Sequence, residues 1–376
     1  MFYIGLMSGT SLDGVDGVLI RFDALARAAV HAHAHRPFSE PEKQALLSLN
    51  EPGSNELHRA ALAANALARL SAAVVADLLE RANVPANQIL AIASHGQTVR
   101  HRPLEFDGTG YTTQLNNPAL LAELSGIDVI ADFRSRDVAA GGQGAPLVPA
   151  FHRVTFGQDA AQQPLCAAVV NIGGISNISV LNADGTAIGF DCGPGNALMD
   201  RWCQEHTGAA FDCDGAWAST GTVVAALMEA LQDDPYFSRQ PPKSTGRDWF
   251  SRAWLDQRLR DLQDAGSINA QDVQATLTEL TAWACAEDVL RFAPAAANVV
   301  VCGGGAFNRF LMARLTARLA GMRVVTSQAY GMPVDQVEAA AFAWLARAFM
   351  LRQPGNLPSV TGASGGRILG ALYPAR

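Results

Sequence analysis

Residues 2–16 read FYIGLMSGTSLDGVD, and this stretch decides the fold that we expect for the whole chain. An apolar run gives way to small and hydroxylated residues, and a second apolar run follows at Val18-Leu19-Ile20. That order predicts a strand, a tight turn and a second strand. Gly9 and Gly14 allow backbone N–H groups to converge, and convergent N–H and hydroxyl donors are typical of phosphate cradles. An ordinary hairpin, whose glycines and aspartates only satisfy turn geometry, fits the same pattern.

The acidic residues of this turn indicate what else a phosphate cradle here would need. Asp13 and Asp16 would repel phosphate by themselves, because both groups are negatively charged. They fit if a divalent cation lies between carboxylate and phosphates. We therefore expect a cation at this turn wherever the phosphate interpretation holds.

The composition narrows the class of protein. The chain has 376 residues, a length that favours two domains, and 49% of the residues are hydrophobic while 17% are charged. The net charge of −7 argues against a nucleic-acid surface. We expect no membrane span and no secretory signal, because no apolar run is long enough and no basic segment precedes the first one. Six scattered cysteines without a CxxC pair suit reduced thiols in a cytoplasmic protein.

Polar residues follow two predicted strands of the first half. The strand Ile89–Ala93 precedes Ser94-His95-Gly96-Gln97-Thr98, and ligands of open α/β sheets lie at such strand ends. His95, Gln97 and Thr98 would hydrogen-bond a polyhydroxylated molecule, although a satisfied loop histidine explains His95 equally simply.

The second of these strands, Ile127–Ala131, precedes Arg134, which is a candidate clamp for a substrate carboxylate. An ion pair of Arg134 with Asp132 or Asp137 is the alternative. Upstream, residues 30–35 alternate so that three histidines share one strand face, which is either solvated or a metal site.

The second half repeats the opening theme. A glycine-rich segment, Ala140–Pro146, is the best candidate for a hinge, and Cys166–Ile172 beyond it is an apolar run that ends at Gly173-Gly174. Strands at Ile178–Leu181 and Ala187–Phe190 follow, so the chain has the outline of a duplicated domain.

Asp191 directly follows the last of these strands, and Gly195-Asn196 opens a helix whose free N–H groups suit an anion. A carboxylate at that position serves as a general base or a metal ligand; a helix N-cap is the alternative, but N-caps normally lie nearer the helix start. Later, the strand Asn298–Cys302 runs into Gly303-Gly304-Gly305, where a flat nucleoside ring could lie against the backbone.

Five motifs in this order resemble the anhydro-N-acetylmuramic acid kinases, within the superfamily of actin, sugar kinases and heat-shock chaperones. The resemblance covers nearly the whole chain. Its motifs are MSGTSLDG (7–14), SHGQT (94–98), NIGGISN (171–177), DCGPGN (191–196) and CGGGA (302–306). It implies an α/β fold of two related ribonuclease H-like domains, each a mixed sheet flanked by helices, with an ATP cleft between them. We place these domains at 1–140 and 141–376, with the alternative that the C-terminal tail packs back on the first domain.

The resemblance also implies an activity. Members of the family use ATP and Mg²⁺, open the 1,6-anhydro ring of 1,6-anhydro-N-acetylmuramic acid with water, and phosphorylate O6 to give N-acetylmuramic acid 6-phosphate in peptidoglycan recycling. Asp191 maps to the base that activates the water. The ATP-binding residues map to Gly9, Thr10, Ser11, Leu12, Asp13, Gly14, Val15, Asp16, Gly173, Gly174, Gly303, Gly304 and Gly305. The sugar-binding residues map to His95, Gln97, Thr98, Arg134, Gly193, Asn196 and Glu338.

One position departs from the wider superfamily. Many sugar kinases carry an aspartate two residues before the first-turn glycine, where this chain has Met7. Mg²⁺ would then be held differently, with Asp13 as the candidate ligand. Two other functions stay open: a conventional amino-sugar or hexose kinase, and a non-enzymatic ATP-dependent binding module. We expect small-molecule partners, no nucleic acid and no membrane, with a homodimer as one option.

Overall fold

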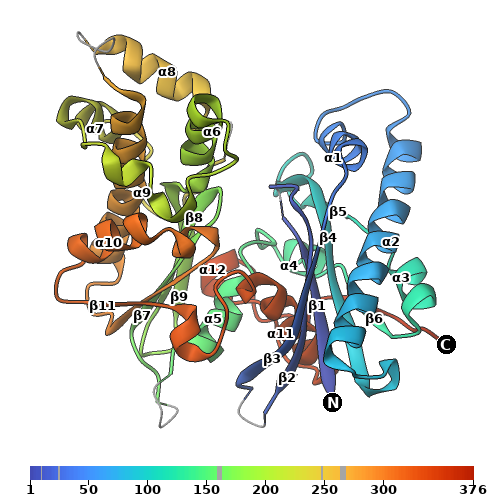
Figure 1. Cartoon of the computed structure of the whole chain (residues 1–376). Helices are drawn as coiled ribbons and strands as arrows, with labels where there is room; N and C mark the ends of the chain where they lie inside the picture. The colour runs from blue at the N-terminus through green and yellow to red at the C-terminus, as the bar shows by residue number, and fades with distance from the viewer. Residues whose placement is uncertain (10, 24–25, 159–162, 247–248, 263–267) are drawn as a thin grey trace. The chain divides into compact units, whose positions relative to one another are not determined.

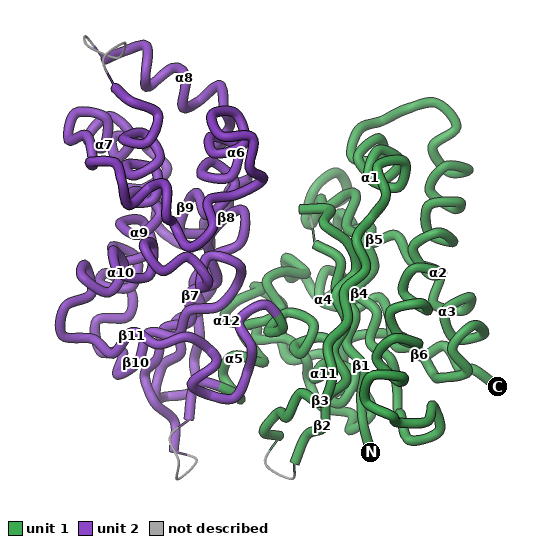
Figure 2. The backbone as a smooth tube through the Cα atoms, viewed as in Figure 1, with its two compact units in different colours: residues 1–155, 336–376 green, residues 156–335 purple. Residues whose placement is uncertain are grey.

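The computed structural model describes residues 1–9, 11–23, 26–158, 163–246, 249–262 and 268–376 (Figure 1). Thr10, a predicted phosphate-binding residue, lies outside them. The chain divides into two compact units, one formed by residues 1–155 and 336–376 and the other by residues 156–335 (Figure 2). We call them unit 1 and unit 2. Unit 1 runs past the predicted boundary after residue 140 to residue 155, and it also includes the last 41 residues of the chain.

Unit 1 is built on a mixed sheet in the order β12-β6-β4-β1-β2-β3, with β5 paired to β4. β1, β2 and β3 are antiparallel neighbours, whereas β1–β4 and β4–β6 are parallel pairs. The strands are β1 (Phe2–Ser8), β2 (Gly14–Phe22), β3 (Ala28–Pro37), β4 (Ile89–Pro103), β5 (Gly110–Leu115), β6 (Val129–Ala131) and β12 (Ala371–Tyr373). The helices are α1 (Glu40–Leu47), α2 (Glu56–Ala82), α3 (Pro118–Ser125), α4 (Ser135–Val138), α5 (Val148–Phe156, which ends at the unit boundary), α11 (Val337–Met350) and α12 (Pro358–Thr361).

Helix α11 explains why the C-terminal segment belongs to unit 1. It lies on β1 so closely that a Cβ at Gly5 would collide with the carbonyl oxygen of Ala339. Gly17 faces the other side of the sheet, where a Cβ would meet Val74 of α2. Gly5 and Gly17 thus point to opposite faces of the sheet. Each lets one helix from a distant part of the sequence pack closely on its own face.

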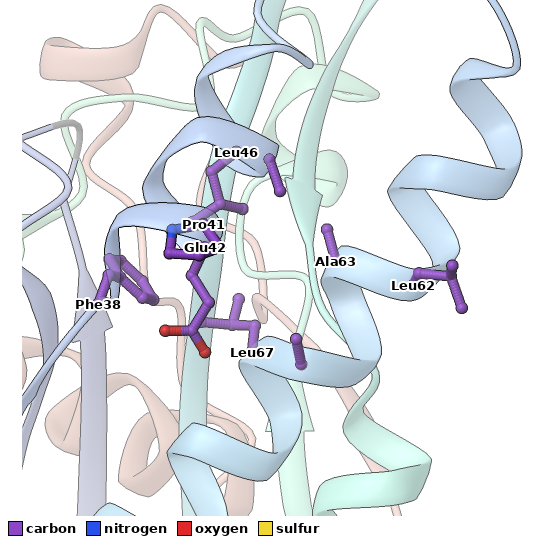
Figure 3. Close-up of a pocket in the computed structure, with 9 residues that line it drawn as sticks. Phe38, Pro41, Glu42, Leu46, Leu62, Ala63 and Leu67 are labelled. Atoms are coloured by element: carbon purple, nitrogen blue, oxygen red, sulfur yellow. The ribbon is translucent and has the colours of Figure 1, made fainter.

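Helix α2 differs from one expectation. By length and composition alone it could span a membrane, with a mean hydropathy of 1.5 over 18 residues, although we expected no such run. Its buried stripe, which includes Leu67, Val74 and Leu78, packs in the core of unit 1. A core helix passes the same test, so α2 is weak evidence for a membrane span. Between α1 and α2 lies a mainly apolar cavity of about 180 Å³, lined by Phe38, Leu46 and Leu67 among others (Figure 3).

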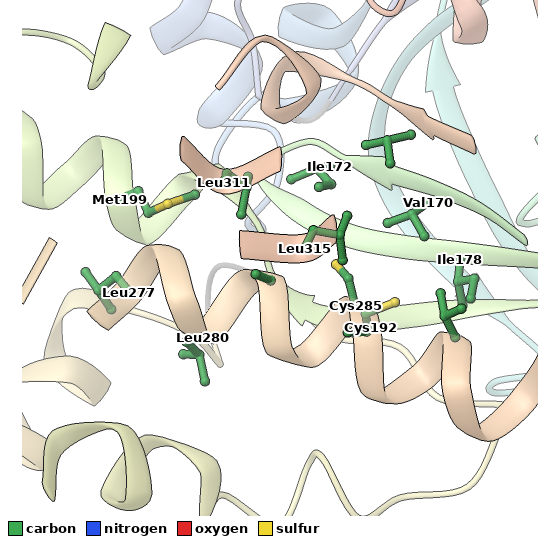
Figure 4. Close-up of a cluster of buried hydrophobic side chains, with 14 of the residues drawn as sticks. Val170, Ile172, Ile178, Cys192, Met199, Leu277, Leu280, Cys285, Leu311 and Leu315 are labelled. Carbon is green, nitrogen blue, oxygen red and sulfur yellow. The ribbon is translucent and has the colours of Figure 1, made fainter. Parts of the chain in front are cut away.

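Unit 2 has a five-stranded sheet in the order β11-β10-β7-β8-β9. Its strands are β7 (Ala167–Ile172), β8 (Ile175–Leu181), β9 (Ala187–Pro194), β10 (Asn298–Cys302) and β11 (Arg323–Thr326). Its helices are α6 (Asn196–Thr207), α7 (Ala225–Gln232), α8 (Arg252–Asp261), α9 (Ala270–Phe292) and α10 (Arg309–Arg318). The long helix α9 carries Leu277, Leu280 and Cys285 into a core that also includes Cys192 of β9 (Figure 4).

The two sheets share one plan. β7–β8 and β8–β9 are antiparallel, whereas β10 is parallel to β7 and β11 is parallel to β10. The order β9-β8-β7-β10-β11 therefore repeats β3-β2-β1-β4-β6 of unit 1 in both sequence order and strand direction. This repeat confirms the predicted α/β class with two related mixed sheets.

The face of three histidines on β3 does not form a metal site. Within the described part of the chain, no group of three or more His, Cys, Asp or Glu side chains is arranged to hold a metal ion. His33 Nε2 and His35 Nδ1 instead contact Asp16 Oδ1, at 3.2 and 3.0 Å. The ring of His31 packs edge-on against Phe2.

Candidate active site

The first glycine turn is fixed by close backbone contacts. Leu12 adopts a left-handed conformation with φ 58° and donates its N–H to the Gly9 carbonyl at 3.2 Å. A Cβ at Gly14 would collide with the Arg36 carbonyl, so glycine is needed where the end of β3 pairs with the start of β2. The described phosphate-binding candidates lie along this turn and the start of β2, with Ser11 and Asp13 exposed.

Strand β4 continues well past its predicted end. Ser94 to Thr98 were predicted to follow the strand, but β4 extends to Pro103 and includes them. Their burial explains the difference, since His95 is 4% and Gln97 is 2% exposed and both need protein partners. Ser8 donates its hydroxyl to Gln97 Oε1, which fixes the amide of Gln97 from the end of β1.

Arg134 contacts His95 rather than a carboxylate. Its Nε and Nη2 lie 3.1 and 2.9 Å from His95 Nε2, and its Nη1 donates to the Gly144 carbonyl at 2.7 Å. Burial, with the positive charge of Arg134, lowers the pKa of His95 to about 3. The imidazole is therefore neutral at neutral pH, and Nε2 accepts the guanidinium N–H groups.

The ion-pair alternative for Arg134 is not what the structure shows. Among the described residues, neither Asp132 nor Asp137 lies within ion-pair distance of Arg134. Burial lowers the pKa of Arg134 to about 10, and the negative charges of Glu338 and Asp137 partly oppose this. Glu338 itself is exposed in the first turn of α11.

Asp137 connects the Arg134 region to other parts of unit 1 through hydrogen bonds. It is fully buried and accepts hydrogen bonds from Gly144 N at 2.8 Å, Asn356 Nδ2 at 2.6 Å and Thr361 Oγ1 at 2.8 Å. The predicted hinge 140–146 is thus tied within unit 1, to α4 on one side and to the C-terminal segment on the other. Sequence reasoning missed this role, because two of the three partners, Asn356 and Thr361, lie more than 200 positions away.

In unit 2, Asp191 lies within β9 rather than after it. Its backbone N–H donates to the Lys243 carbonyl at 3.1 Å, and its backbone carbonyl accepts from Tyr236 Oη at 2.7 Å. Its side-chain Oδ2 accepts the backbone N–H of Thr245 at 3.0 Å. The N-cap of α6 is Gly195, so the capping alternative for Asp191 is excluded.

The environment of Asp191 suits a general base. Burial raises its pKa to about 6, against the lowering effect of the Thr245 amide and of the positive charge on Lys243. A carboxylate with this pKa is ionised at neutral pH yet more basic than an ordinary aspartate. Raised values of this kind are frequent at catalytic positions.

The glycine turns of unit 2 are held by internal contacts. The N–H groups of Gly195 and Asn196 donate to the carbonyls of Gly174 and Gly173, at 3.0 and 2.7 Å. These two N–H groups are therefore used within the chain, contrary to their predicted availability for an anion. The Asn196 side chain also turns inward, and Nδ2 donates to the Ile172 carbonyl at 3.2 Å.

The turn after β10 packs closely against the end of β7. Gly303 has φ 81°, and a Cβ there would collide with Asn171 Oδ1. A Cβ at Gly305 would collide with Ile172 Cγ2, whereas one at Gly304 would find its nearest neighbour at 3.5 Å. Packing alone thus accounts for two of these glycines, whereas a Cβ at Gly304 would make only an ordinary van der Waals contact with Asn196 Nδ2.

Sequence reasoning also missed the segment that carries Lys243 and Thr245. It follows Pro241-Pro242 in an irregular stretch without hydrophobic periodicity, so no pattern singled it out. Lys243 stands among mixed polar, charged and aromatic residues, so the local composition did not single it out either.

Comparison with known proteins places the chain in a family. The family profile described as Anhydro-N-acetylmuramic acid kinase matches residues 1–375. Relatives of that name are 60% identical in Variovorax paradoxus, 58% in Albidiferax ferrireducens and 57% in Cupriavidus pinatubonensis. Each alignment covers 99% of this chain, and 99%, 99% and 98% of the respective relative. The chain belongs to the anhydro-N-acetylmuramic acid kinase family.

Proposed function

We propose that this protein is an ATP-dependent kinase that opens 1,6-anhydro-N-acetylmuramic acid with water and phosphorylates O6, giving N-acetylmuramic acid 6-phosphate for peptidoglycan recycling. Family membership supports the activity, and the environment of Asp191 is the observation that carries the mechanism. The carboxylate is partly buried, its Oδ2 is anchored by the Thr245 amide at 3.0 Å, and its pKa is raised to about 6.

In the proposed step, Asp191 accepts a proton from a water molecule whose oxygen bonds to C1 of the sugar. The bond between C1 and O6 breaks, and O6 takes the γ-phosphoryl group of ATP while ADP leaves. The charge that develops on O6 passes to the new phosphate ester, so no separate proton donor is required. One base is sufficient, and the anchored Oδ2 restricts how the Asp191 carboxylate can rotate.

The first turn of unit 1 fits a site for ATP phosphates and Mg²⁺. Gly9, the hydroxyl of Ser11 and the exposed carboxylate of Asp13 lie together along one tight turn. Mg²⁺ typically binds one or two carboxylates together with substrate phosphates, and this donor set suits that mode. When bound, the ion would offset phosphate charge during transfer. In unit 2 we assign the nucleotide to Gly173, Gly174 and Gly303 to Gly305.

We assign sugar binding in unit 1 to His95, Gln97, Thr98, Arg134 and Glu338. The neutral His95 and the amide of Gln97 are held by Arg134 and Ser8, so they offer preorganised groups for hydroxyls. Gly193 and Asn196 are the assignments in unit 2. At Gly193 a Cβ would lie 2.8 Å from the Phe237 ring, so packing already explains that glycine.

We further assign the protein to the cytoplasm, with small-molecule substrates and without nucleic-acid or membrane partners. Light scattering after gel filtration would test whether it forms a homodimer.

The deciding experiment measures ADP release with ATP, Mg²⁺ and 1,6-anhydro-N-acetylmuramic acid, beside N-acetylmuramic acid, glucose and no sugar. We expect turnover with the anhydro sugar alone, and ¹⁸O from labelled water at the anomeric position of the product. Turnover confined to open-ring sugars, without label at C1, would make it a conventional kinase. ATP binding without turnover of any sugar would favour a binding module.

A further inference from the structure

A buried ion pair lies beside Asp191 in unit 2. Lys243 Nζ is 3.1 Å from Asp288 Oδ2 and 3.3 Å from Oδ1, and the two side chains are only 2% and 6% exposed. The ammonium also lies against the rings of Phe190 and Tyr236, at 5.4 and 5.1 Å from their centroids. Phe190 directly precedes Asp191 in β9, so the cation packs against the residue next to the proposed base.

The same segment is bonded directly to Asp191. The Lys243 carbonyl accepts the Asp191 N–H, and the Thr245 N–H, two residues on, donates to Asp191 Oδ2. Tyr236, whose ring faces the ammonium, donates its hydroxyl to the Asp191 carbonyl. Three hydrogen bonds to Asp191 therefore come from residues 236–245, the stretch that holds Lys243 in place.

Stability by itself is a weak explanation for such a pair. Removing two charges from water costs several kcal/mol per ion, and well-packed apolar residues often replace a buried pair without loss. Asp288 lies on α9, which packs against β8 and β9. Its ion pair with Lys243 therefore holds the lysine cation in the interior of unit 2, near β9, the strand that carries Asp191. An interior cation acts strongly on a nearby carboxylate, because water screens it little.

We propose that Lys243 is a positioning residue for Asp191: its ammonium, paired with Asp288 and held against Phe190 and Tyr236, keeps the catalytic carboxylate ionised and oriented. The proposal rests on the function proposed above for Asp191. The positive charge on Lys243 is one of the causes that oppose the rise in the pKa of Asp191. The charged and titratable groups that surround the pair are Tyr236 and Arg239 from the same stretch, Cys285, Asp288 and Arg291 from α9, and Cys192 from β9.

The test is the pH dependence of kcat/KM for the anhydro sugar. In Lys243→Met we expect the ascending limb to move up by about one pH unit, since a carboxylate that loses a nearby cation is harder to ionise. At pH 6, activity should then fall about fivefold, approaching about tenfold at lower pH, and it should recover at high pH. The double variant Lys243→Met/Asp288→Asn leaves neither partner of the ion pair charged. It therefore separates the effect of losing the Lys243 cation from the effect of leaving the Asp288 carboxylate buried without its partner.

The double variant decides between the two roles. If the cation acts on Asp191, the limb moves in the double variant as it does in Lys243→Met. A limb that returns to the wild-type position in the double variant, or that never moves, overturns the proposal and makes the pair structural. Arg318→Met is the matched control, because it removes a cation from the buried Glu279 in the same unit, and we expect an unchanged limb.

A second readout does not depend on turnover. Above pH 6, Asp191→Asn should raise the stability of the protein, and this gain should be larger when Asp191→Asn is added to Lys243→Met/Asp288→Asn than when it is added to the wild type. Equal gains overturn the proposal. A wild type that turns over no anhydro sugar would overturn the proposed function, whereas the stability comparison would still report whether Lys243 acts on Asp191.

Discussion

Replacing Asp191 with asparagine should abolish turnover and, above pH 6, make the protein more stable. Burial raises the pKa of Asp191 from its ordinary value of 3.8 to about 6, so the folded protein holds this carboxylate ionised at a cost. One pH unit of pKa difference corresponds to about 1.4 kcal/mol. The difference between the two values therefore sets an upper limit of about 3 kcal/mol on the gain from Asp191→Asn at pH 8.

The sign of the effect follows from the two pKa values. Below 3.8 the carboxyl is protonated in both the folded and unfolded states, and the substitution changes little. Between 3.8 and about 6 the unfolded state ionises first, so the wild type loses stability relative to Asp191→Asn. Above about pH 6 the difference in stability between the wild type and Asp191→Asn is constant. At pH 4 we expect a gain of less than about 1 kcal/mol.

Urea unfolding followed by tryptophan fluorescence at pH 4 and pH 8 measures this gain, because Trp202, Trp254 and Trp283 all lie in unit 2. Asp261→Asn replaces an exposed aspartate of the same unit, and it should show no pH-dependent gain. If Asp191→Asn is no more stable than the wild type at pH 8, burial does not raise the free energy of the ionised carboxylate. The argument for a raised pKa, and with it the assignment of the base, would then be wrong.

Three further substitutions test unit 1. Gly5→Ala should cost about 3 kcal/mol of stability, measured by urea unfolding, because its Cβ would collide with the Ala339 carbonyl on α11. Thr361→Val removes one of the donors to buried Asp137 and should cost about 1–3 kcal/mol in the same assay. Arg134→Lys loses the planar fork that reaches His95 and Gly144 together, so KM for the sugar should rise about tenfold while KM for ATP stays constant. An unchanged KM for the sugar would contradict the role assigned to Arg134.

Local pattern in the sequence was sufficient for the strands that meet at glycine turns. The apolar runs at 2–6, 167–172 and 298–302 are strands, and the turn residues between them lie where the motifs indicated. The outline of a duplicated domain also followed from this pattern, because each half begins with strands that meet at a glycine turn. Glycine spacing could not reveal the reason for individual glycines, since Gly5, Gly303 and Gly305 are needed by neighbours that are distant in sequence.

The errors have a common physical origin in long-range contacts. β4 was predicted to end at residue 93 because polar residues follow, yet inside the sheet Ser8 donates to Gln97 and Arg134 donates to His95. The alternative that the C-terminal tail packs back on the first domain carried no bounds for the same reason, because Gly5, the partner of α11, is more than 300 positions away. No local propensity encodes either contact.

The protonation state of a site residue is likewise a tertiary property. The motif DCGPGN names Asp191, but the same hexapeptide in water would hold an ordinary aspartate. Burial in β9 raises the pKa of Asp191, and the residues that limit the rise, Lys243 and Thr245, come from a segment with no recognisable motif. The sequence could therefore suggest which residue is the base, but only the structure could suggest why its pKa is raised.

This dependence makes the kinetic and the stability experiments two measurements of one quantity. If removing Lys243 and Asp288 together raises the pKa of folded Asp191, the pH limb of kcat/KM moves by that amount in the free enzyme. The stability gained from Asp191→Asn must then grow by about 1.4 kcal/mol for each pH unit of movement, because both report the free energy of the same ionised carboxylate. If the ascending limb of kcat/KM moves by one pH unit without that increase in stability, the limb reports the titration of a side chain other than Asp191. The agreement of the two numbers is therefore a stricter test of Asp191 as the base than the loss of activity in Asp191→Asn alone.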